Sequence, residues 1–334
     1  MRQNILVTGG AGYIGSHTCK ALYGAGFQPI VVDDLVYGRE SFVRWGSLVR
    51  GDVRDVELMT RLIQDNQVAA VMHFAALAYV GESVAYPQKY YDNNVVGMLR
   101  LLEAMEAGGC KKIVFSSTCA VYGEAGEDPI NEAMEPRPVN PYGRSKLMCE
   151  MVLKDVASAT DLAFTALRYF NAAGADADGM LGEDRTIETH LIPRAMMALQ
   201  GHLDDFQVFG SDFATPDGTA IRDYIHVSDL ANAHVTALKR LLSDEAKATT
   251  LNLGTGTGFS VREVLSAIER ASQRKLPDVV GARRPGDPSR LIADATLARE
   301  MIDFNPRCSD LDTIVQTAWR WHQKAHPERQ PALR

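Results

Sequence analysis

The stretch Ile5-Leu-Val-Thr-Gly-Gly-Ala-Gly-Tyr-Ile-Gly15 decides the fold. A short apolar run leads into Gly10-Ala-Gly12-Tyr-Ile-Gly15, which fits G-x-G-x-x-G, and Gly9 adds one more glycine ahead of it. Small residues let the backbone turn tightly and approach a pyrophosphate, which binds at a helix N-terminus. The pattern therefore predicts a strand, a phosphate-binding turn and a helix, the opening unit of a dinucleotide-binding fold.

An acidic residue is expected about one helix after such a turn, and Asp33 ends the second apolar run 18 residues past it. A carboxylate there can hold the hydroxyls of an adenosine ribose and repels a 2′-phosphate, which favours NAD over NADP. Arg39 and Arg44 lie close in the sequence and keep NADP open as an alternative. Asp52 and Val53 follow the third apolar segment, either at the edge of the adenine or, for Asp52, as a plain helix N-cap.

The first 170 residues alternate short apolar runs with longer segments of helical periodicity. This alternation predicts a Rossmann-type α/β fold, a doubly wound parallel sheet of seven strands with helices on both faces. The expected strands are Ile5–Val7, Ile30–Val32, Val68–Ala76, Ile113–Phe115 and Leu162–Leu167. The expected helices are Ile14–Gly26, Val56–Asn66, Lys89–Ala107 and Tyr142–Ser158.

The rhythm changes after residue 170, which predicts an NAD-binding domain over 1–170 and a smaller carboxyl-terminal α/β substrate lobe over 171–334. Parts of 220–255 are expected to return to the main sheet. The segment 171–189 is expected to be a loop, followed by a helix over His190–Gln200. Other expected elements are a strand over Phe206–Phe209, a helix near Asp229–Leu242 and a strand over Thr250–Leu253. Ser260 and Glu263 form a capping box, which marks the glycine run 254–258 as a turn into a helix rather than a second phosphate loop.

Composition excludes several classes of function. The net charge of −7 argues against nucleic acid or an anionic membrane as the main partner. The five cysteines are irregularly spaced and form no C-x-x-C, so neither a disulfide framework nor a metal site is predicted. The longest apolar stretch, 68–80, falls short of the roughly 18 residues needed to span a bilayer. A cytoplasmic protein is the simplest expectation.

A catalytic group is indicated by Tyr142-Gly-Arg-Ser-Lys146. On a helix, Tyr142 and Lys146 share one face one turn apart, and a nearby ammonium favours the phenolate. The tyrosine could then act as a base near neutral pH. A third member is expected among the hydroxyls that end an upstream strand, in Ser116-Ser-Thr118, because ligands of such sheets bind outside the strand carboxyl ends.

Together, these residues and motifs identify a known family that the chain resembles. The chain closely resembles the UDP-glucose 4-epimerases (UDP-galactose 4-epimerases) of the extended short-chain dehydrogenase/reductase family, over nearly its whole length. The segments that carry the resemblance are Val7–Thr18, His73–Ala76, Val80–Val84, Tyr90–Asn94, Tyr142–Met148, Leu167–Asn171, Arg222–Leu230 and Arg283–Asp287. Of these, Val80–Val84, Tyr90–Asn94 and Arg222–Leu230 are the most specific to the epimerases.

The resemblance implies an isomerase that keeps tightly bound NAD⁺ through turnover and interconverts UDP-glucose and UDP-galactose. Tyr142 would remove the proton of the sugar 4-hydroxyl while a hydride leaves C4. Thr118 would hold or relay that proton, and Lys146 would lower the tyrosine pKa and bind the nicotinamide ribose. A 4-keto sugar would then turn within the site and take the hydride back on its other face.

The resemblance also implies the binding residues. Those expected to hold the cofactor are Gly9, Gly12, Tyr13, Ile14, Gly15, Asp33, Asp34, Asp52, Val53, Phe74, Ala75, Ala76, Asn93, Tyr142, Lys146 and Phe170. Those expected to hold the UDP-sugar are Thr118, Asn171, His190, Leu191, Gln207, Phe209, Arg222, Tyr224, Arg284, Asp287 and Leu291. Either Arg283 or Arg284 could be the one that faces the diphosphate. A homodimer is expected, joined through helices near 93–107 and 142–158.

The chain departs from the family pattern at a few positions. Ala78 stands where many bacterial epimerases carry a lysine that contacts the cofactor, Thr118 replaces a serine, and His190 replaces a frequent asparagine. Leu291 stands at the position where other members of the family carry a tyrosine that blocks N-acetyl groups. Because leucine is smaller than tyrosine, this position predicts some tolerance of UDP-N-acetylhexosamines.

Several alternatives stay open. A 4-epimerase of UDP-N-acetylhexosamines or UDP-pentoses would differ only in pocket residues, and one for UDP-uronic acids would need an extra cation near the sugar. Nucleotide-sugar dehydratases place Asp-Glu after the active-site threonine, whereas Cys119 and Ala120 follow Thr118 here. Outside the enzymes, an NAD sensor without catalysis or an interaction scaffold would have little need of Tyr142, Lys146 and Thr118 together.

Overall fold

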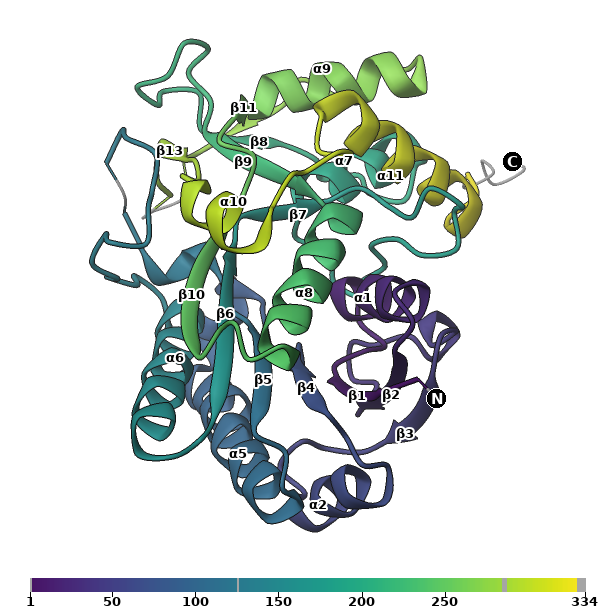
Figure 1. The fold of residues 1–334 in the computed structure, drawn as a ribbon. Coiled ribbons are helices and arrows are strands. Elements are labelled where there is room, and N and C mark those ends of the chain that lie inside the picture. Colours follow the sequence, from purple (N-terminus) through teal and green to yellow (C-terminus); the bar gives the residue numbers. More distant parts are fainter. Residues whose placement is uncertain (1, 125, 284–286, 329–334) are drawn as a thin grey trace.

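A computed structural model describes residues 2–124, 126–283 and 287–328 (Figure 1). Its centre is a parallel sheet of seven strands in the order β10-β6-β5-β4-β1-β2-β3. The strands are β1 (Asn4–Thr8), β2 (Gln28–Asp33), β3 (Ser47–Arg50), β4 (Ala70–His73), β5 (Lys112–Ser116), β6 (Ala163–Tyr169) and β10 (Ala248–Leu253). The doubly wound sheet predicted from the alternating pattern is confirmed, and β10 joins its edge by pairing in parallel with β6.

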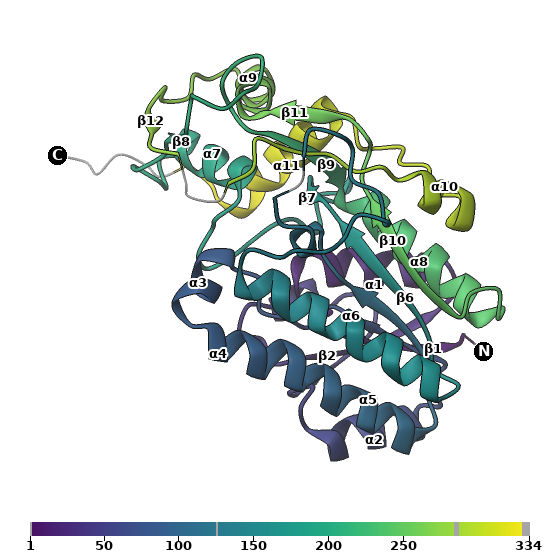
Figure 2. The same cartoon turned by 90° about the vertical axis from the view of Figure 1, so that its left-hand side faces the viewer.

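Helices cover both faces of this sheet, which buries two apolar cores. On one face lie α1 (Tyr13–Gly24) and α8 (Val227–Leu242), whose apolar residues pack with those of β1 and β10. On the other face lie α2 (Val56–Asp65), α5 (Gly97–Gly108) and α6 (Pro141–Ala159), side by side in Figure 2. None of the helices in the described part of the chain is both long and apolar enough to cross a bilayer.

The carboxyl-terminal lobe is built on β9 (Ile221–His226), which lies between β11 (Gly258–Ser260) and β13 (Arg290–Leu291). The end of β9 also pairs with β7 (Asn171–Ala173). Its other elements are β8 (Val208–Phe209), β12 (Val280–Gly281), α7 (Leu191–Leu199), α9 (Val261–Ser272), α10 (Thr296–Ile302) and α11 (Leu311–Ala325). The capping box of α9 is present as predicted. The loop expected over 171–189 was wrong at its start, because residues 171–173 form β7 and pair with β9.

The single helix expected over Lys89–Ala107 is interrupted. The structure has α3 (Val80–Ala85), α4 (Pro87–Tyr90), a π-helical segment over Tyr91–Val96, and then α5. Such wide turns often occur at functional sites, because they rotate side chains out of helical register. Here Asn94 uses its amide to bond both backbone groups of Leu77 and the hydroxyl of Ser145. The segment after β4 is thereby fixed to α6.

A buried ion pair joins α6 to the sheet. Arg168 on β6 donates to both carboxylate oxygens of Glu150 on α6, and both side chains are almost fully buried. Glu150 also accepts the hydroxyl hydrogen of Ser117 at 2.5 Å, and Arg168 donates to the Tyr122 hydroxyl at 2.8 Å. Tyr122 in turn donates to Asn252 on β10 at 2.7 Å. The network therefore connects the carboxyl ends of three neighbouring strands with one helix.

Five histidines are buried among the described residues, and each has a lowered pKa. Burial lowers the pKa of His17 to about 4, of His73 to about 3 and of His234 to about 4. The Nδ1 atom of His73 bonds the Thr8 hydroxyl at 2.7 Å, and that of His234 bonds the Leu230 carbonyl at 2.9 Å. Protonation of any of them would leave a charge in the core.

Replacing Arg168 by Met should destabilise the fold strongly, because Glu150 would remain as a buried carboxylate without its cation. Breaking a buried pair in this way costs about 3–5 kcal/mol, to be measured as the free energy of unfolding in urea. The control is Arg137→Met, which removes an ion pair to Glu135 that is 78% and 72% exposed. That change should stay within about 0.5 kcal/mol. An equally small effect for both variants would contradict the role of the buried pair.

Stability should also fall as the pH drops below 6.5. In the unfolded chain these histidines protonate near 6.5, whereas in the fold they stay neutral, so the unfolded state binds more protons. Each should cost about 1.4 kcal/mol between pH 7.5 and pH 5.5. In urea titrations, the free energy of unfolding of His234→Leu should fall between these two pH values by about 1.4 kcal/mol less than that of the unmodified chain. His202→Gln, at an exposed position, should leave the pH dependence unchanged, and a pH dependence identical in all three proteins would sink the idea.

Candidate functional site

The glycine turn predicted for a pyrophosphate has the geometry that only glycines allow. Gly9 has a φ of +71°, and a Cβ built on it would lie 2.5 Å from the backbone nitrogen of Ala75. A Cβ on Gly15 would lie 2.2 Å from the Gly9 carbonyl oxygen. The turn thus brings the N-terminus of α1 against the segment that follows β4, where the amides of the first helical turn can meet a phosphate.

Asp33 lies at the carboxyl end of β2, and its carboxylate is held in place by the backbone. It accepts the amide hydrogens of Ala11 and Leu35, each at 2.9 Å. Burial raises its pKa from the ordinary value. Each carboxylate oxygen keeps a further lone pair, as binding of a ribose diol requires.

A cavity beside this turn collects most of the residues expected around the adenosine half of a dinucleotide. We call it the glycine-turn cavity. It is lined by Gly9, Gly12, Val32, Asp33, Asp34, Val36, Tyr37, Gly38, Gly51, Asp52, Val53, Phe74, Ala75, Ala76, Leu77 and Asn93. The N-cap alternative for Asp52 was wrong, because α2 is capped by Asp55, which accepts from the Leu58 amide at 3.0 Å.

The three expected catalytic residues meet at the carboxyl end of β5. Thr118 follows the strand, and Tyr142 lies on α6, whose first turn is capped by Asn140. Burial raises the pKa of Tyr142, while a hydrogen bond with Thr118 and the charge of Arg185 oppose that rise. Lys146 donates from Nζ to the Ser116 carbonyl at 2.8 Å, and burial lowers its pKa to about 8.

A second cavity, which we call the Tyr142 cavity, opens over this group. Its lining combines the start of α1 with the end of β6 and the loop of the carboxyl-terminal lobe. Among its lining residues are Tyr13, Ile14, Ala78, Thr118, Tyr142, Tyr169, Phe170, Asn171, Glu183, Arg185, His190, Leu191 and Tyr224. Expected cofactor residues and expected substrate residues therefore share one space.

A third cavity, the Arg222 cavity, adjoins it through the shared residues Asn171, His190, Leu191 and Tyr224. It further contains the expected substrate residues Gln207, Phe209, Arg222 and Asp287. Arg222 donates from Nη2 to Asp287 at 2.8 Å. Arg194, which the sequence did not single out, also lines it and donates to the Glu188 carbonyl at 3.3 Å.

Leu291 is not among the residues that line these cavities, and a second expected substrate residue is not part of the described structure. Arg284 lies outside the described residues, and its neighbour Arg283 donates to the Asp287 carbonyl at 3.1 Å. Leu291 on β13 packs against the apolar cluster of Phe170 and Tyr122. Phe170 of the same cluster lines the Tyr142 cavity, whereas Leu291 does not, so tolerance of N-acetyl groups stays a prediction.

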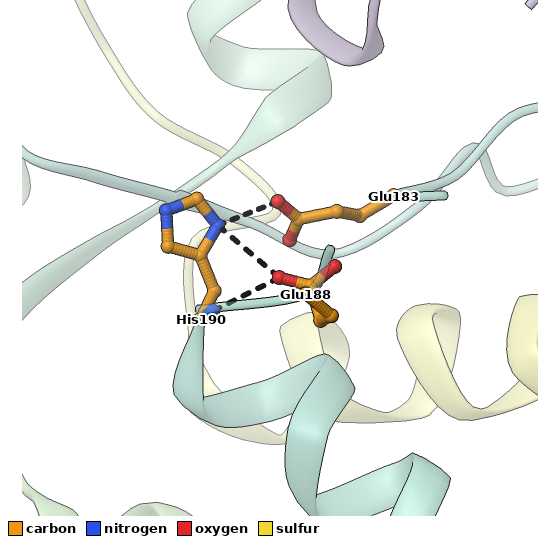
Figure 3. A group of neighbouring side chains, drawn as sticks. All are labelled: Glu183, Glu188 and His190. Atoms are coloured by element: carbon orange, nitrogen blue, oxygen red, sulfur yellow. Dashed lines mark hydrogen bonds and ion pairs between the residues drawn. The ribbon is translucent and has the colours of Figure 1, made fainter. Parts of the chain in front are cut away.

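His190 was expected at the substrate, but the sequence reasoning missed the carboxylates around it in the loop of the carboxyl-terminal lobe, which Figure 3 shows. His190 bonds Glu183 through Nδ1 at 2.6 Å, and its backbone amide donates to Glu188 at 2.9 Å. Arg185 donates from Nε to Glu183 at 2.8 Å. Although burial raises the pKa of Glu183, His190 and Arg185 bring it below its ordinary value, whereas burial and Glu183 raise that of Glu188.

These carboxylates lie within 4.8 Å of one another and of the His190 ring, close enough to hold a metal. Their hydrogen bonds, however, are made with Arg185, His190 and backbone amides of the loop. Arg185 supplies the positive charge that Glu183 needs. No spacing pattern marks this group in the sequence, because its members lie in a segment without periodicity.

The glycine run at 254–258 is not a phosphate loop. The carboxylate of Asp223 accepts the amide hydrogens of Thr255 at 2.9 Å and Gly256 at 3.0 Å. It also accepts the amide hydrogen of Ala293 at 3.1 Å. Amides that would otherwise be available to an anion are thus used within the fold, which confirms the interpretation as a turn into a capped helix.

The comparison with known families agrees with this geometry. The model of the NAD dependent epimerase/dehydratase family matches residues 5–254. The chain belongs to the NAD dependent epimerase/dehydratase family. The glycine turn, Asp33 and the cavity beside them fit the cofactor in this family's name, because the turn leads into the N-terminus of α1 and Asp33 lines the same cavity as the turn.

Several proteins of named activity are similar to this chain over nearly its whole length. A UDP-glucose 4-epimerase of Rhizobium meliloti is 49% identical over 96% of this chain and 97% of its own length. The structure of a UDP-glucose 4-epimerase from Brucella ovis in complex with NAD is 52% identical with a TM-score of 0.92, covering 95% of this chain and 97% of that one. That of the Bifidobacterium longum enzyme with NAD⁺ and UDP is 40% identical with a TM-score of 0.91, covering 97% and 99%.

Replacing Asp33 by Asn should weaken NAD binding about tenfold, because the charge that pairs with the ribose hydroxyls is lost while one oxygen still accepts a backbone amide. The preference for NAD over NADP should shrink in the same variant, since the repulsion of the 2′-phosphate is removed. Titrations of both cofactors monitored by protein fluorescence would measure this. Asp55→Asn keeps a competent N-cap and should bind as the unmodified chain does. Undiminished discrimination in Asp33→Asn would contradict the assignment.

Proposed function

We propose that this chain is a UDP-glucose 4-epimerase, which interconverts UDP-glucose and UDP-galactose with NAD as its cofactor. One observation carries the proposal: the Tyr142 cavity and the Arg222 cavity share four lining residues, and the lining of the Tyr142 cavity also includes the start of α1. A sugar attached to a nucleotide in the Arg222 cavity would therefore meet Tyr142, Thr118 and a nicotinamide in one place. The named relatives support both the cofactor and the nucleotide sugar.

The two halves of the site hold different ligands in this proposal. The cofactor is held by the glycine turn, by Asp33 at the adenosine ribose, and by Lys146 near the nicotinamide ribose. The UDP-sugar is held in the Arg222 cavity, where Arg222 offers charge-assisted donors to the diphosphate and Asp287 orients the guanidinium. Phe209 and Gln207 line the same cavity and would contact the nucleoside.

NAD, when bound, would supply the hydride acceptor for oxidation at the sugar C4 and the hydride donor for the reverse step. Tyr142 removes the proton of the 4-hydroxyl and gives it back after the sugar has turned. Thr118 bonds the Tyr142 hydroxyl, so it can hold the sugar hydroxyl beside the base. The buried ammonium of Lys146 favours the phenolate over the phenol. Because Arg222 fixes the diphosphate, the sugar can turn about its bonds to the phosphate without leaving the site.

The local residues separate this reaction from related ones. A 4,6-dehydratase needs an acid beside the active-site hydroxyl for elimination, whereas Cys119 and Ala120 line the Tyr142 cavity next to Thr118. UDP-pentoses and UDP-N-acetylhexosamines are alternative substrates, and the assay below includes them. A sensor without catalysis has no use for a hydrogen-bonded Tyr142 and Thr118.

The proposed enzyme works as a homodimer in the cytoplasm. Leu99 on α5 and Met148 and Met151 on α6 are 47%, 46% and 56% exposed. Contiguous exposed apolar side chains on neighbouring helices are typical of an interface between subunits. All five cysteines are free, as a reducing compartment requires.

The proposal is tested with purified protein and UDP-galactose, supplied without added NAD, while UDP-glucose formation is followed in a coupled assay. Turnover is expected, because the cofactor stays bound through purification. Tyr142→Phe should lower kcat about 10³-fold, since general base catalysis is lost, with the NAD content unchanged.

Tyr169→Phe is the matched control, because it removes another hydroxyl from the same cavity, one that bonds Ser116 at 2.7 Å. It should lower kcat less than tenfold. Turnover of UDP-arabinose or UDP-N-acetylglucosamine alone would move the assignment to those sugars. A Tyr142→Phe variant with full activity would refute the mechanism.

A further inference from the structure

A dinucleotide that spans this site must pass from the glycine-turn cavity to the Tyr142 cavity. Its diphosphate lies at the junction of the two, since the adenosine side is marked by Asp33 and the nicotinamide side by Tyr142. Tyr13 and Ile14 at the start of α1 line the Tyr142 cavity at this junction. Two negative charges are therefore to be neutralised there, and the helix N-terminus supplies only about half an elementary charge.

Few cations are available for this task. Ala78 lines the Tyr142 cavity but carries no charge. Lys146 donates from Nζ to the Ser116 carbonyl. Among the described residues that line the two cavities, Arg185 is the one lysine or arginine. Its guanidinium is therefore the strongest positive charge that the fold presents to the cofactor's path.

The position of Arg185 places it at the junction rather than at the uridine end. Its Cζ lies 5.4 Å from the centre of the Tyr79 ring, on the segment that follows β4. The Tyr79 ring contacts that of Tyr37 with 5.1 Å between centroids, and Tyr37 lines the glycine-turn cavity. Arg185 also acts on the hydroxyls of both Tyr13 and Tyr142, because its charge opposes the rise in their pKa.

Arg185 has donors to spare. Its Nε donates to Glu183, and a looser polar contact reaches the Tyr79 hydroxyl. No hydrogen bond of normal length connects its two terminal amino groups to any residue that the structure describes. A guanidinium held by one carboxylate through Nε presents these two groups as a fork, the geometry that binds phosphate oxygens in pairs.

The diphosphate of the UDP-sugar does not compete for this arginine. The Arg222 cavity has cations of its own in Arg222 and Arg194, and Arg185 is not part of its lining. The diphosphate of the cofactor is therefore the anion that Arg185 is placed to meet.

We propose that Arg185 is a cofactor-binding residue that reaches across from the carboxyl-terminal lobe and holds the diphosphate of NAD on its nicotinamide side. It rests on the proposed function only in taking NAD as the cofactor. Glu183 is its positioning residue, because the ion pair at 2.8 Å fixes the plane of the guanidinium. The lobe that binds the substrate thereby also retains the cofactor between turnovers.

The test measures cofactor retention in the holoenzyme. Arg185→Gln, Arg185→Lys and the unmodified protein are gel-filtered, and the NAD that remains per protomer and its rate of release into an NADH chase are determined. Release from Arg185→Gln should be at least tenfold faster, with Arg185→Lys between the two because it keeps the charge but loses the fork. With saturating NAD added, the KM for UDP-galactose should stay within twofold.

Asp184→Asn is the matched control, because it removes the neighbouring ion pair of the same loop, Arg39 to Asp184 at 3.1 Å, and leaves Arg185 in place. It should retain NAD fully. Equal loss of NAD from Asp184→Asn would overturn the proposal, since the effect would belong to the loop. Unchanged retention in Arg185→Gln would overturn it too, as would a tenfold higher KM for UDP-galactose with NAD retained. NAD retention is measured without substrate. Its outcome therefore does not depend on whether the protein turns over UDP-galactose.

Discussion

The site depends on one buried carboxylate. Glu150 lies one turn beyond Lys146 on α6, and it is bonded both to Arg168 on β6 and to Ser117, the residue before Thr118. The helix that carries Tyr142 and the strand end that carries Thr118 are thus fixed against each other by the same side chain. Two charges buried together contribute little net stability, yet they allow one arrangement and penalise others. The position of Tyr142 relative to Thr118 is therefore set by side chains that are themselves buried.

Much of the fold and half of the site follow from the sequence, because their signals are local. The glycine turn, the alternating apolar runs and the Tyr142–Lys146 spacing each depend on neighbours within one or two turns. The π-helical segment over Tyr91–Val96 could not be predicted this way, since its cause is the pairing of Asn94 with Leu77 and Ser145, which lie far away in the chain. The short strand β7 likewise exists because β9 offers it a partner.

Arg185 shows the same limit in the site. It stands in a segment rich in Gly, Asp and Ala, and nothing around it is periodic. Its position is set by contacts with Glu183 on one side and with Tyr79 on the other. Tyr79 lies more than a hundred residues away in the chain. Carboxylates behave alike elsewhere in the chain: Asp33 and Asp223 are used to hold backbone amides of turns. Part of the acidic net charge therefore comes from carboxylates that hold turns inside the fold, and not from residues on the surface.

The junction between β9 and α8 has a mechanical consequence. The strand that presents Arg222 and Tyr224 ends at His226, and the helix packed on α1 begins at Val227, with no intervening linker. The Tyr13 hydroxyl on α1 also donates to the Gly174 carbonyl at 2.6 Å. A continuous strand–helix connection and a hydrogen bond between α1 and the segment after β7 thus both join the two halves of the molecule. A movement that separated the lobe carrying Arg222 from α1 would have to break that hydrogen bond and pull α8 along with β9.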